Sequence, residues 1–364
     1  QVLQNGGAWT LQIGAVSSEG TIYKDFYLSP SFVHSSSSQL AYVRSRGAIG
    51  RSNTDAINGI GGYYHNGVNG LFGGSLVVAK DTRHVSGNLF VREFSDQTVV
   101  RQSASSIPEF DQSYDVIFRD NLAKDDQLNA NPIGITVRQQ SYSKTGSSYV
   151  LYQFDIVNSS GSNLDSIYVG LGADWDVGNA GANLGGYDGS RRLTYVYDQG
   201  AIDPSYYGLV TVSGPPSGQL IYQNGQDPND SATYRVMQNI LGGGSSAGDL
   251  RAFIAMGPYS IPAGGEVRTV FAVAGGDNLA DLQVQADSAL FKASLFTNLP
   301  TAFTQFRMQD SLALVDLYNA TNGPSWTNKT NWLSSSPINS WFGVRMLNGR
   351  VDSLLLFDNN LVGT

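Results

Sequence analysis

The residues best suited to chemistry stand in one short glycine-rich stretch. Asp174-Trp175-Asp176-Val177-Gly178-Asn179 follows a strand-like segment, and Asn183 and Asp188 come soon after it. Ca²⁺ takes about six to eight oxygen ligands from carboxylates, amides and backbone carbonyls. We therefore expect a structural calcium site whose ligands are Asp174, Asp176, Asn179, Asn183 and Asp188. The alternative is a loop without a metal, because Asp and Asn side chains also bond to their own backbone in turns.

The chain offers no motif for catalysis. Its three histidines, His34, His65 and His84, lie in the first quarter without an HExxH pattern, so we expect packed or surface roles rather than zinc ligation. No G-x-S-x-G elbow stands between a strand and a helix, so a Ser-His-Asp arrangement has no anchor in the sequence. We expect neither a catalytic site nor a bound organic cofactor, and predict that the chain is not an enzyme. A glycosidase remains an alternative, because its paired carboxylates need only spatial proximity.

The composition indicates a β-rich protein. The 364 residues include 42 Gly, 19 Tyr and 16 Phe, but only 14% are charged, a mixture that favours strands joined by tight turns. A net charge of −8 argues against nucleic-acid partners, which require clustered Lys and Arg. There is no cysteine, and no apolar stretch reaches the ~20 residues of a transmembrane helix.

Periodicity places the elements that must position these residues. Val150, Tyr152, Phe154 and Ile156 alternate with other residues, which predicts a strand with one face on a core. After Asp277, apolar residues recur every three or four positions, which predicts a helix with Asp277 as its N-cap. We expect mainly β structure: a large antiparallel β-sandwich region over 1–298 with a closing helix, as one unit or as subdomains at about 1–110 and 111–298. The glycine-dense segment 59–74 is expected to form hairpin turns with exposed aromatic residues.

The C-terminal segment 299–364 carries the most specific pattern. Val351-x-x-Leu354-x-Leu356-x-x-Asn359-x-Leu361 fits the leucine-rich repeat. With Gly323-x-x-Trp326, Trp332 and Trp341-x-Gly343 upstream, it resembles the N-terminal cap and first repeat of bacterial leucine-rich-repeat domains. The resemblance implies a small α/β cap with the three tryptophans in its core. One repeat cannot bury its own apolar face, so we expect the natural protein to continue past Thr364.

A second resemblance concerns the origin of the chain. The segments NPIGITVRQQSY, YQFDIVNSSGSNLDSIYVGLGADWDVGN and YSIPAGGEVRTVFAVAGG are similar to parts of secreted surface proteins of Bacteroidota and allied phyla, which are often exported by a type IX system. The resemblance implies an extracellular or outer-surface location. Gln1 begins the chain without Met or a basic start, so we expect a mature N-terminus left by signal-peptide removal. Asp-Ser followed by an apolar residue, at Asp165, Asp230, Asp287 and Asp310, resembles the O-glycosylation signal of that phylum.

These observations lead to a functional hypothesis with one main alternative. We expect a non-enzymatic extracellular or cell-surface structural or adhesion protein that presents a leucine-rich-repeat interaction arm. Its partners would be proteins or glycans at the cell surface, including other copies of itself in a larger assembly. The alternative is a carbohydrate-binding or protease-accessory module of a larger secreted enzyme.

Overall fold

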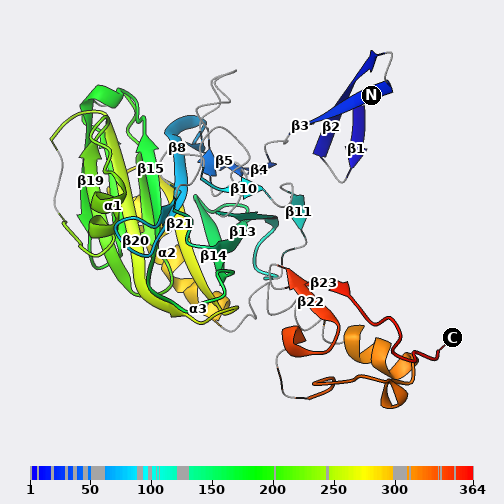
Figure 1. The fold of residues 1–364 in the computed structure, drawn as a ribbon. Coiled ribbons are helices and arrows are strands. Elements are labelled where there is room, and N and C mark those ends of the chain that lie inside the picture. Colours follow the sequence, from blue (N-terminus) through cyan, green and yellow to red (C-terminus); the bar gives the residue numbers. More distant parts are fainter. Residues whose placement is uncertain are drawn as a thin grey trace.

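The computed structural model describes three longer parts of the chain: 62–87, 101–297 and 310–363, together with the short segment 93–96. Within 101–297 it leaves out 104, 106, 121–130, 201 and 243–245. Within 310–363 it leaves out 311, 312, 335, 337, 348 and 349. Of the first fifty residues it describes only strand segments. The described chain is mainly β, and all its paired strands are antiparallel. Two nine-stranded sheets form a sandwich (Figure 1). The predicted fold class is therefore confirmed, apart from the leucine-rich-repeat cap.

The first sheet, sheet 1, lies beneath the closing helix. Its strands in spatial order are β10 (Ser95–Asp96), β12 (Gln112–Arg119), β13 (Ile135–Ser143), β14 (Tyr149–Asn158), β21 (Glu266–Gly276), β18 (Tyr206–Thr211), β17 (Leu193–Asp198) and β16 (Asn183–Asp188), with β11 (Arg101–Ser103) beside β12.

The second sheet, sheet 2, is built from earlier and later parts of the chain. Its strands in spatial order are β19 (Pro216–Gln223), β20 (Leu250–Ile261), β15 (Leu164–Trp175), β8 (Val68–Ala79), β6 (Ala48–Gly50), β5 (Gln39–Val43) and β4 (Phe32–Ser35), with β7 (Tyr63–His65) and β9 (Val85–Ser86) paired beside them. A further sheet contains β1 (Val2–Asn5), β2 (Ala8–Ser17) and β3 (Gly20–Leu28).

The main core lies between the two sheets. Tyr152 and Phe154 of β14 meet Trp175 of sheet 2 there, as the period-two pattern predicts. Ala41 and Leu76 belong to the same core. Residues before and after position 110 therefore contribute to the same core.

The closing helix covers the outer face of sheet 1. Helix α2 (Leu279–Phe291) and the short α3 (Ala293–Thr297) bury a second apolar cluster that includes Leu282 and Ala286. The N-cap is Asn278, whose side chain accepts a hydrogen bond from the Asp281 backbone N–H. The predicted cap, Asp277, is wrong by one residue, because its carboxylate faces His65 instead.

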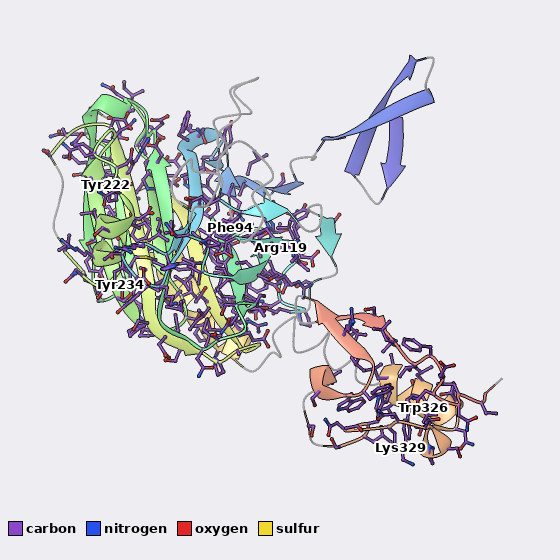
Figure 2. All side chains as sticks on the ribbon, viewed as in Figure 1. Phe94, Arg119, Tyr222, Tyr234, Trp326 and Lys329 are labelled. Carbon is purple, nitrogen blue, oxygen red and sulfur yellow. The ribbon has the colours of Figure 1, made fainter. Side chains whose placement is uncertain are left out.

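Helix α1 (Asp230–Val236) packs against the outer face of sheet 2. Its N-cap, Asn229, accepts a hydrogen bond from the backbone N–H of Ala232. Tyr234 packs beside a small apolar cluster that contains Tyr168 and Phe253 (Figure 2). Among the described residues, no helix is long and apolar enough to cross a membrane.

The C-terminal part has its own small core. It contains helical residues 313–320, the 3₁₀ turns η3 (Gly323–Ser325) and η4 (Ile338–Ser340), and a hairpin of β22 (Val344–Leu347) and β23 (Arg350–Leu354). Trp326, Trp332 and Trp341 are buried together, which confirms their predicted role as core residues (Trp326 is labelled in Figure 2).

The residues of the proposed repeat have mixed environments. The Asn359 side chain accepts from the backbone N–H of Asn328 and donates to its carbonyl, as a turn asparagine should. Leu354, however, is 39% exposed. The leucine-rich repeat itself stays a prediction.

Candidate functional site

Of the three aspartates among the predicted calcium ligands, Asp174 is the most deeply buried. It lies near the end of β15 and pairs with Arg251 of β20, with 3.2 Å between carboxylate Oδ2 and guanidinium. Arg251 also pairs with Asp227. Burial raises the pKa of Asp174 to about 6, although Arg251 pulls it in the opposite direction. The positive charge that balances the Asp174 carboxylate therefore comes from Arg251, where the prediction had a calcium ion.

Asp176 follows β15 and belongs to the same acidic surroundings. Its backbone N–H donates to the Gly70 carbonyl at 3.0 Å. Burial and the negative charge of Asp249 both raise its pKa. Asp174 and Asp176 thus lie in one electrostatic environment, as expected from their spacing.

The Asn183 side chain holds the loop after β15 in place. Its amide donates to the carbonyls of Val177 (2.6 Å) and Asn179 (3.0 Å), and its oxygen accepts from the Val177 N–H (3.1 Å). The loop closes through the 3₁₀ turn η2 (Ala180–Ala182). Asn183 is fully buried, so these hydrogen bonds occupy the side chain.

Asp188 lies at the end of β16 with partners of its own. It accepts hydrogen bonds from Ser190 and Arg191, and from Gln283 of α2 at 3.1 Å. Partial burial acts to raise its pKa, but the bonds from Ser190 and Arg191 prevail and lower the value to about 2. The five predicted ligands therefore fall into separate local arrangements, and calcium binding by them stays a prediction.

A cluster of tyrosines on sheet 1 went unnoticed in the sequence. Tyr195 and Tyr197 of β17 and Tyr206 of β18 lie on the same face, and all three are half-buried. The rings of Tyr197 and Tyr206 stack with centroids 4.5 Å apart and planes 14° apart. Tyr195 lies 6.4 Å from Tyr197 and 6.2 Å from Tyr206. We name these three residues the tyrosine platform.

The surrounding structure fixes the platform. Tyr195 and Tyr206 pack against the apolar cluster beneath α2. Gly186 of β16 lies opposite Tyr195, and a Cβ at this glycine would be 2.5 Å from the tyrosine hydroxyl. Because Gly186 has no side chain, the Tyr195 ring can lie directly against the backbone of β16.

The platform combines three aromatic rings with three phenolic hydroxyls that are available for hydrogen bonding. In the part of the chain that the structure describes, none of the three hydroxyls has a hydrogen-bond partner. Burial raises the pKa of Tyr195, and the negative charge of Asp188 adds to this shift. A phenolic hydroxyl can both donate and accept a hydrogen bond.

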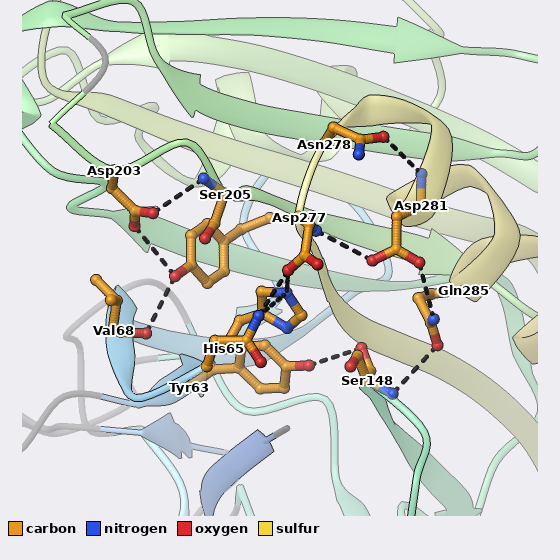
Figure 3. A network of polar contacts seen from close by, with 12 residues as sticks. Tyr63, His65, Val68, Ser148, Asp203, Ser205, Asp277, Asn278, Asp281 and Gln285 are labelled. Carbon is orange, nitrogen blue, oxygen red and sulfur yellow. Dashed lines mark hydrogen bonds and ion pairs between the residues drawn. The ribbon is translucent and has the colours of Figure 1, made fainter. Parts of the chain in front are cut away.

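A second polar site lies where β7, β21 and α2 meet (Figure 3). His65 Nε2 is 2.9 Å from Asp277 Oδ1, which also accepts from the Asn66 amide at 2.6 Å. Asp281 accepts from the Asp277 backbone N–H at 3.0 Å. Among the described residues, His65, Asp277 and Asp281 are the one group of histidine and acidic side chains whose ligand atoms lie close enough, within 4.8 Å, to share a metal ion.

The hairpin that carries His65 differs partly from expectation. Asn66 (φ 48°) and Gly67 (φ 83°) make a tight turn between β7 and β8, as the glycine-rich segment predicts. Tyr63 in this segment is not exposed. It is fully buried, and its hydroxyl donates to the Ser148 carbonyl at 2.7 Å (Figure 3), because β7 pairs into sheet 2 and turns this ring inward.

The other two histidines have packed or surface roles, as expected. His34 is fully buried between the sheets, with its ring nitrogens 2.6 Å from Ser143 Oγ and 2.9 Å from Ser141 Oγ. Burial lowers its pKa to about 3. His84 is partly exposed and pairs with Asp81 at 2.9 Å.

No protein-family model matches the chain, and no curated protein matches it in sequence. Three solved structures are similar to it. A bacterial glucoamylase bound to acarbose has 10% identity and a TM-score of 0.49, over 84% of this chain and 44% of that one. A putative aldose 1-epimerase from Escherichia coli K12 has 8% identity and a TM-score of 0.39, over 67% and 98%. A family 36 α-galactosidase from Geobacillus stearothermophilus has 10% identity and a TM-score of 0.29, over 81% and 44%.

These comparisons correct two predictions. The similar structures are named as carbohydrate-processing enzymes, against the expectation of a non-enzymatic adhesion protein and of a chain that is not an enzyme. Both expectations are withdrawn. The chain spans less than half the length of the glucoamylase. At this level of similarity, what this chain binds has to be argued from its own residues.

Proposed function

We propose that this chain binds carbohydrate through the tyrosine platform, as part of a carbohydrate-active protein. The supporting observation is the row of Tyr195, Tyr197 and Tyr206, half-exposed rings whose hydroxyls lack partners among the described residues. The proposal corresponds to the alternative hypothesis from the sequence, a carbohydrate-binding module of a larger enzyme.

The chemistry of the platform suits a sugar ring. A pyranose has C–H groups on its faces and hydroxyls around its edge, so it needs both apolar contact and hydrogen bonds. Tyrosine supplies a rigid apolar ring and a polar tip in one side chain. Few polar groups, placed on an otherwise aromatic surface, are typical of small-molecule sites that fix a ligand in one orientation.

The platform is held as a binding site should be. Cross-strand pairing of β17 and β18 sets Tyr197 directly opposite Tyr206, and the apolar cluster beneath α2 supports the rings. A site whose side chains are fixed before binding loses less conformational entropy on complex formation.

Affinity electrophoresis tests this proposal directly. The chain is run through gels that contain neutral glucans, galactans, mannans or charged polysaccharides. At least one polysaccharide should retard the unaltered chain, and Tyr197→Ala and Tyr206→Ala should remove most of that retardation. Phe357→Ala is a matched control, because Phe357 is 78% exposed in the C-terminal part, away from sheet 1. Retardation that survives both platform substitutions would contradict the proposal.

Other expectations from the sequence stay outside this test. Export, the type IX resemblance and the leucine-rich-repeat arm remain predictions. If the chain is extracellular, its ligands would be glycans outside the cell. A structural calcium ion in the loop that follows β15 also remains a prediction, separate from the sugar site.

A further inference from the structure

Three potential metal ligands meet at the edge of the sandwich, although they are far apart in the sequence. His65 belongs to β7, Asp277 follows β21, and Asp281 lies in the first turn of α2. Their ligand atoms lie within 4.8 Å of one another. His65 and Asp277 are 212 residues apart. N-terminal capping of α2 accounts for Asn278 and its bond to Asp281, but it does not account for a buried histidine from the opposite sheet.

His65 is held in a fixed orientation. It is only 2% exposed, and its ring packs edge-to-face with Tyr207 at 6.4 Å. Gly275 lies against it so closely that a Cβ there would be 2.8 Å from the histidine Cβ. A ligand that is immobilised before the ion arrives favours binding.

Asp281 is oriented by a chain of hydrogen bonds. Its carboxylate accepts from the Gln285 amide at 3.3 Å, and the Gln285 oxygen accepts from the Ser148 N–H at 3.1 Å (Figure 3). Partners of this kind, one step away from the ion, orient the ligands of protein metal sites. Of the three residues, Asp277 has the most room to change its side-chain conformation, because that side chain is 65% exposed.

We propose that His65, Asp277 and Asp281 form a binding site for a divalent transition-metal ion of the zinc type. One imidazole nitrogen with two carboxylates suits Zn²⁺ better than Ca²⁺, which prefers oxygen ligands alone. Metal–ligand bonds of about 2 Å separate two ligands of one ion by about 3–4 Å. The three ligand atoms lie within 4.8 Å of one another, so only a small rearrangement is needed to place them around one ion. The exposed position of Asp277 leaves room for water as a further ligand.

The ion would add a bond between parts of the fold that packing and hydrogen bonds already join. It would tie the β7–β8 hairpin of sheet 2 to the start of α2 on sheet 1. Gly276, next to Asp277, pairs with Tyr206 of the tyrosine platform. The metal site is argued from different residues, however, so it does not depend on carbohydrate binding.

Isothermal titration of the metal-free full chain with zinc chloride tests the proposal. We expect one zinc ion per chain at this site, and at least a ~100-fold weaker affinity in Asp277→Asn and His65→Gln, since even second-shell changes cost about 10–100-fold. Asp277→Asn is the decisive variant because the residue is exposed and its loss should leave the fold intact. Calcium chloride in place of zinc should give much weaker binding.

His84→Gln provides the matched control. His84 lies 2.9 Å from Asp81, as His65 does from Asp277, but that pair has no third ligand among the described residues. The control should bind zinc as the unaltered chain does. Zinc binding should also raise the unfolding temperature of the control but not that of Asp277→Asn. Absence of zinc binding, equal affinity in Asp277→Asn, or loss of binding in His84→Gln would each overturn the proposal.

Discussion

Tyr197 and Tyr206 face each other across neighbouring strands, and their rings stack 4.5 Å apart with only 14° between their planes. Cross-strand aromatic pairs stabilise a sheet by roughly 0.2–1 kcal/mol, a modest gain for two large side chains that remain half-exposed. Cross-strand contact alone therefore gives only a modest stabilisation, which is compatible with the proposed role of this pair in binding. The predictions below separate binding from stability wherever both could change.

Gly186 should be important for binding although it contributes no side chain. In Gly186→Val the new side chain would meet the Tyr195 hydroxyl, which a Cβ alone approaches to 2.5 Å, so the ring has to move. We expect several-fold weaker glycan binding with all three tyrosines still present. Gly181→Ala is the control, because a Cβ there meets nothing closer than 3.5 Å. Equal affinities for the two variants would show that the position of Tyr195 does not matter.

Asn183 should stabilise the loop that follows β15 through hydrogen bonds, rather than bind calcium. Asn183→Asp removes the donor to the carbonyls of Val177 and Asn179. We expect a loss of about 1–3 kcal/mol in urea unfolding, because the buried Val177 carbonyl loses its donor, whereas the Asn179 carbonyl keeps the Ala182 N–H. A new carboxylate would strengthen a calcium site, so the unfolding is repeated with calcium. Stability restored by calcium would support Asn183 as a ligand instead.

His34 should make the fold sensitive to moderate acid. Its folded pKa of about 3 lies below the unfolded value of about 6.5, so the unfolded state binds the proton first as the pH falls. This group's contribution is present above pH ~6.5 and is lost progressively towards pH ~3, by at most about 1.4 kcal/mol per pH unit. The free energy of unfolding should fall less steeply in His34→Gln than in the unaltered chain. Parallel pH profiles for these two proteins would refute this account.

Arg251 should be required to keep Asp174 charged in the interior. In Arg251→Met the carboxylate loses its buried partner, and we expect a loss of about 3–5 kcal/mol at pH 8. The pKa of Asp174, already raised to about 6 by burial, should rise further. The folded variant then takes up a proton as the pH falls, so the loss should be smaller at pH 5 than at pH 8. Arg235→Met, which removes an exposed arginine from α1, is the control. A pH-independent loss would point to packing rather than charge.

Local patterns predicted most of the fold. The helical spacing in α2 follows from burial of one face. The alternation in β14 marks the face that packs between the sheets, although the opposite face of this strand is buried as well. Asp277 shows the limit of such patterns. Asp277 lies where a helix cap is expected. His65 reaches the Asp277 carboxylate only because the two sheets pack against each other.

The candidate sites were harder to predict for the same reason. Tyr195-x-Tyr197 could have been recognised as one face of a strand, but Tyr206 joins it only through the pairing of β17 with β18. The acidic stretch from Asp174 to Asp188 appeared to be a single ligand set. In the fold, Arg251 from a distant strand and the backbone around Asn183 satisfy much of it.

The most direct test of the central claim is a binding titration at the tyrosine platform. The glycan that retards the chain most strongly is titrated into the unaltered chain and into Tyr197→Ala, with Phe357→Ala alongside. We expect saturable binding that weakens at least about tenfold in Tyr197→Ala, equivalent to a loss of about 1.4 kcal/mol, and stays unchanged in Phe357→Ala. Equal affinity in all three proteins, or no saturable binding to any glycan, would contradict carbohydrate recognition by this surface.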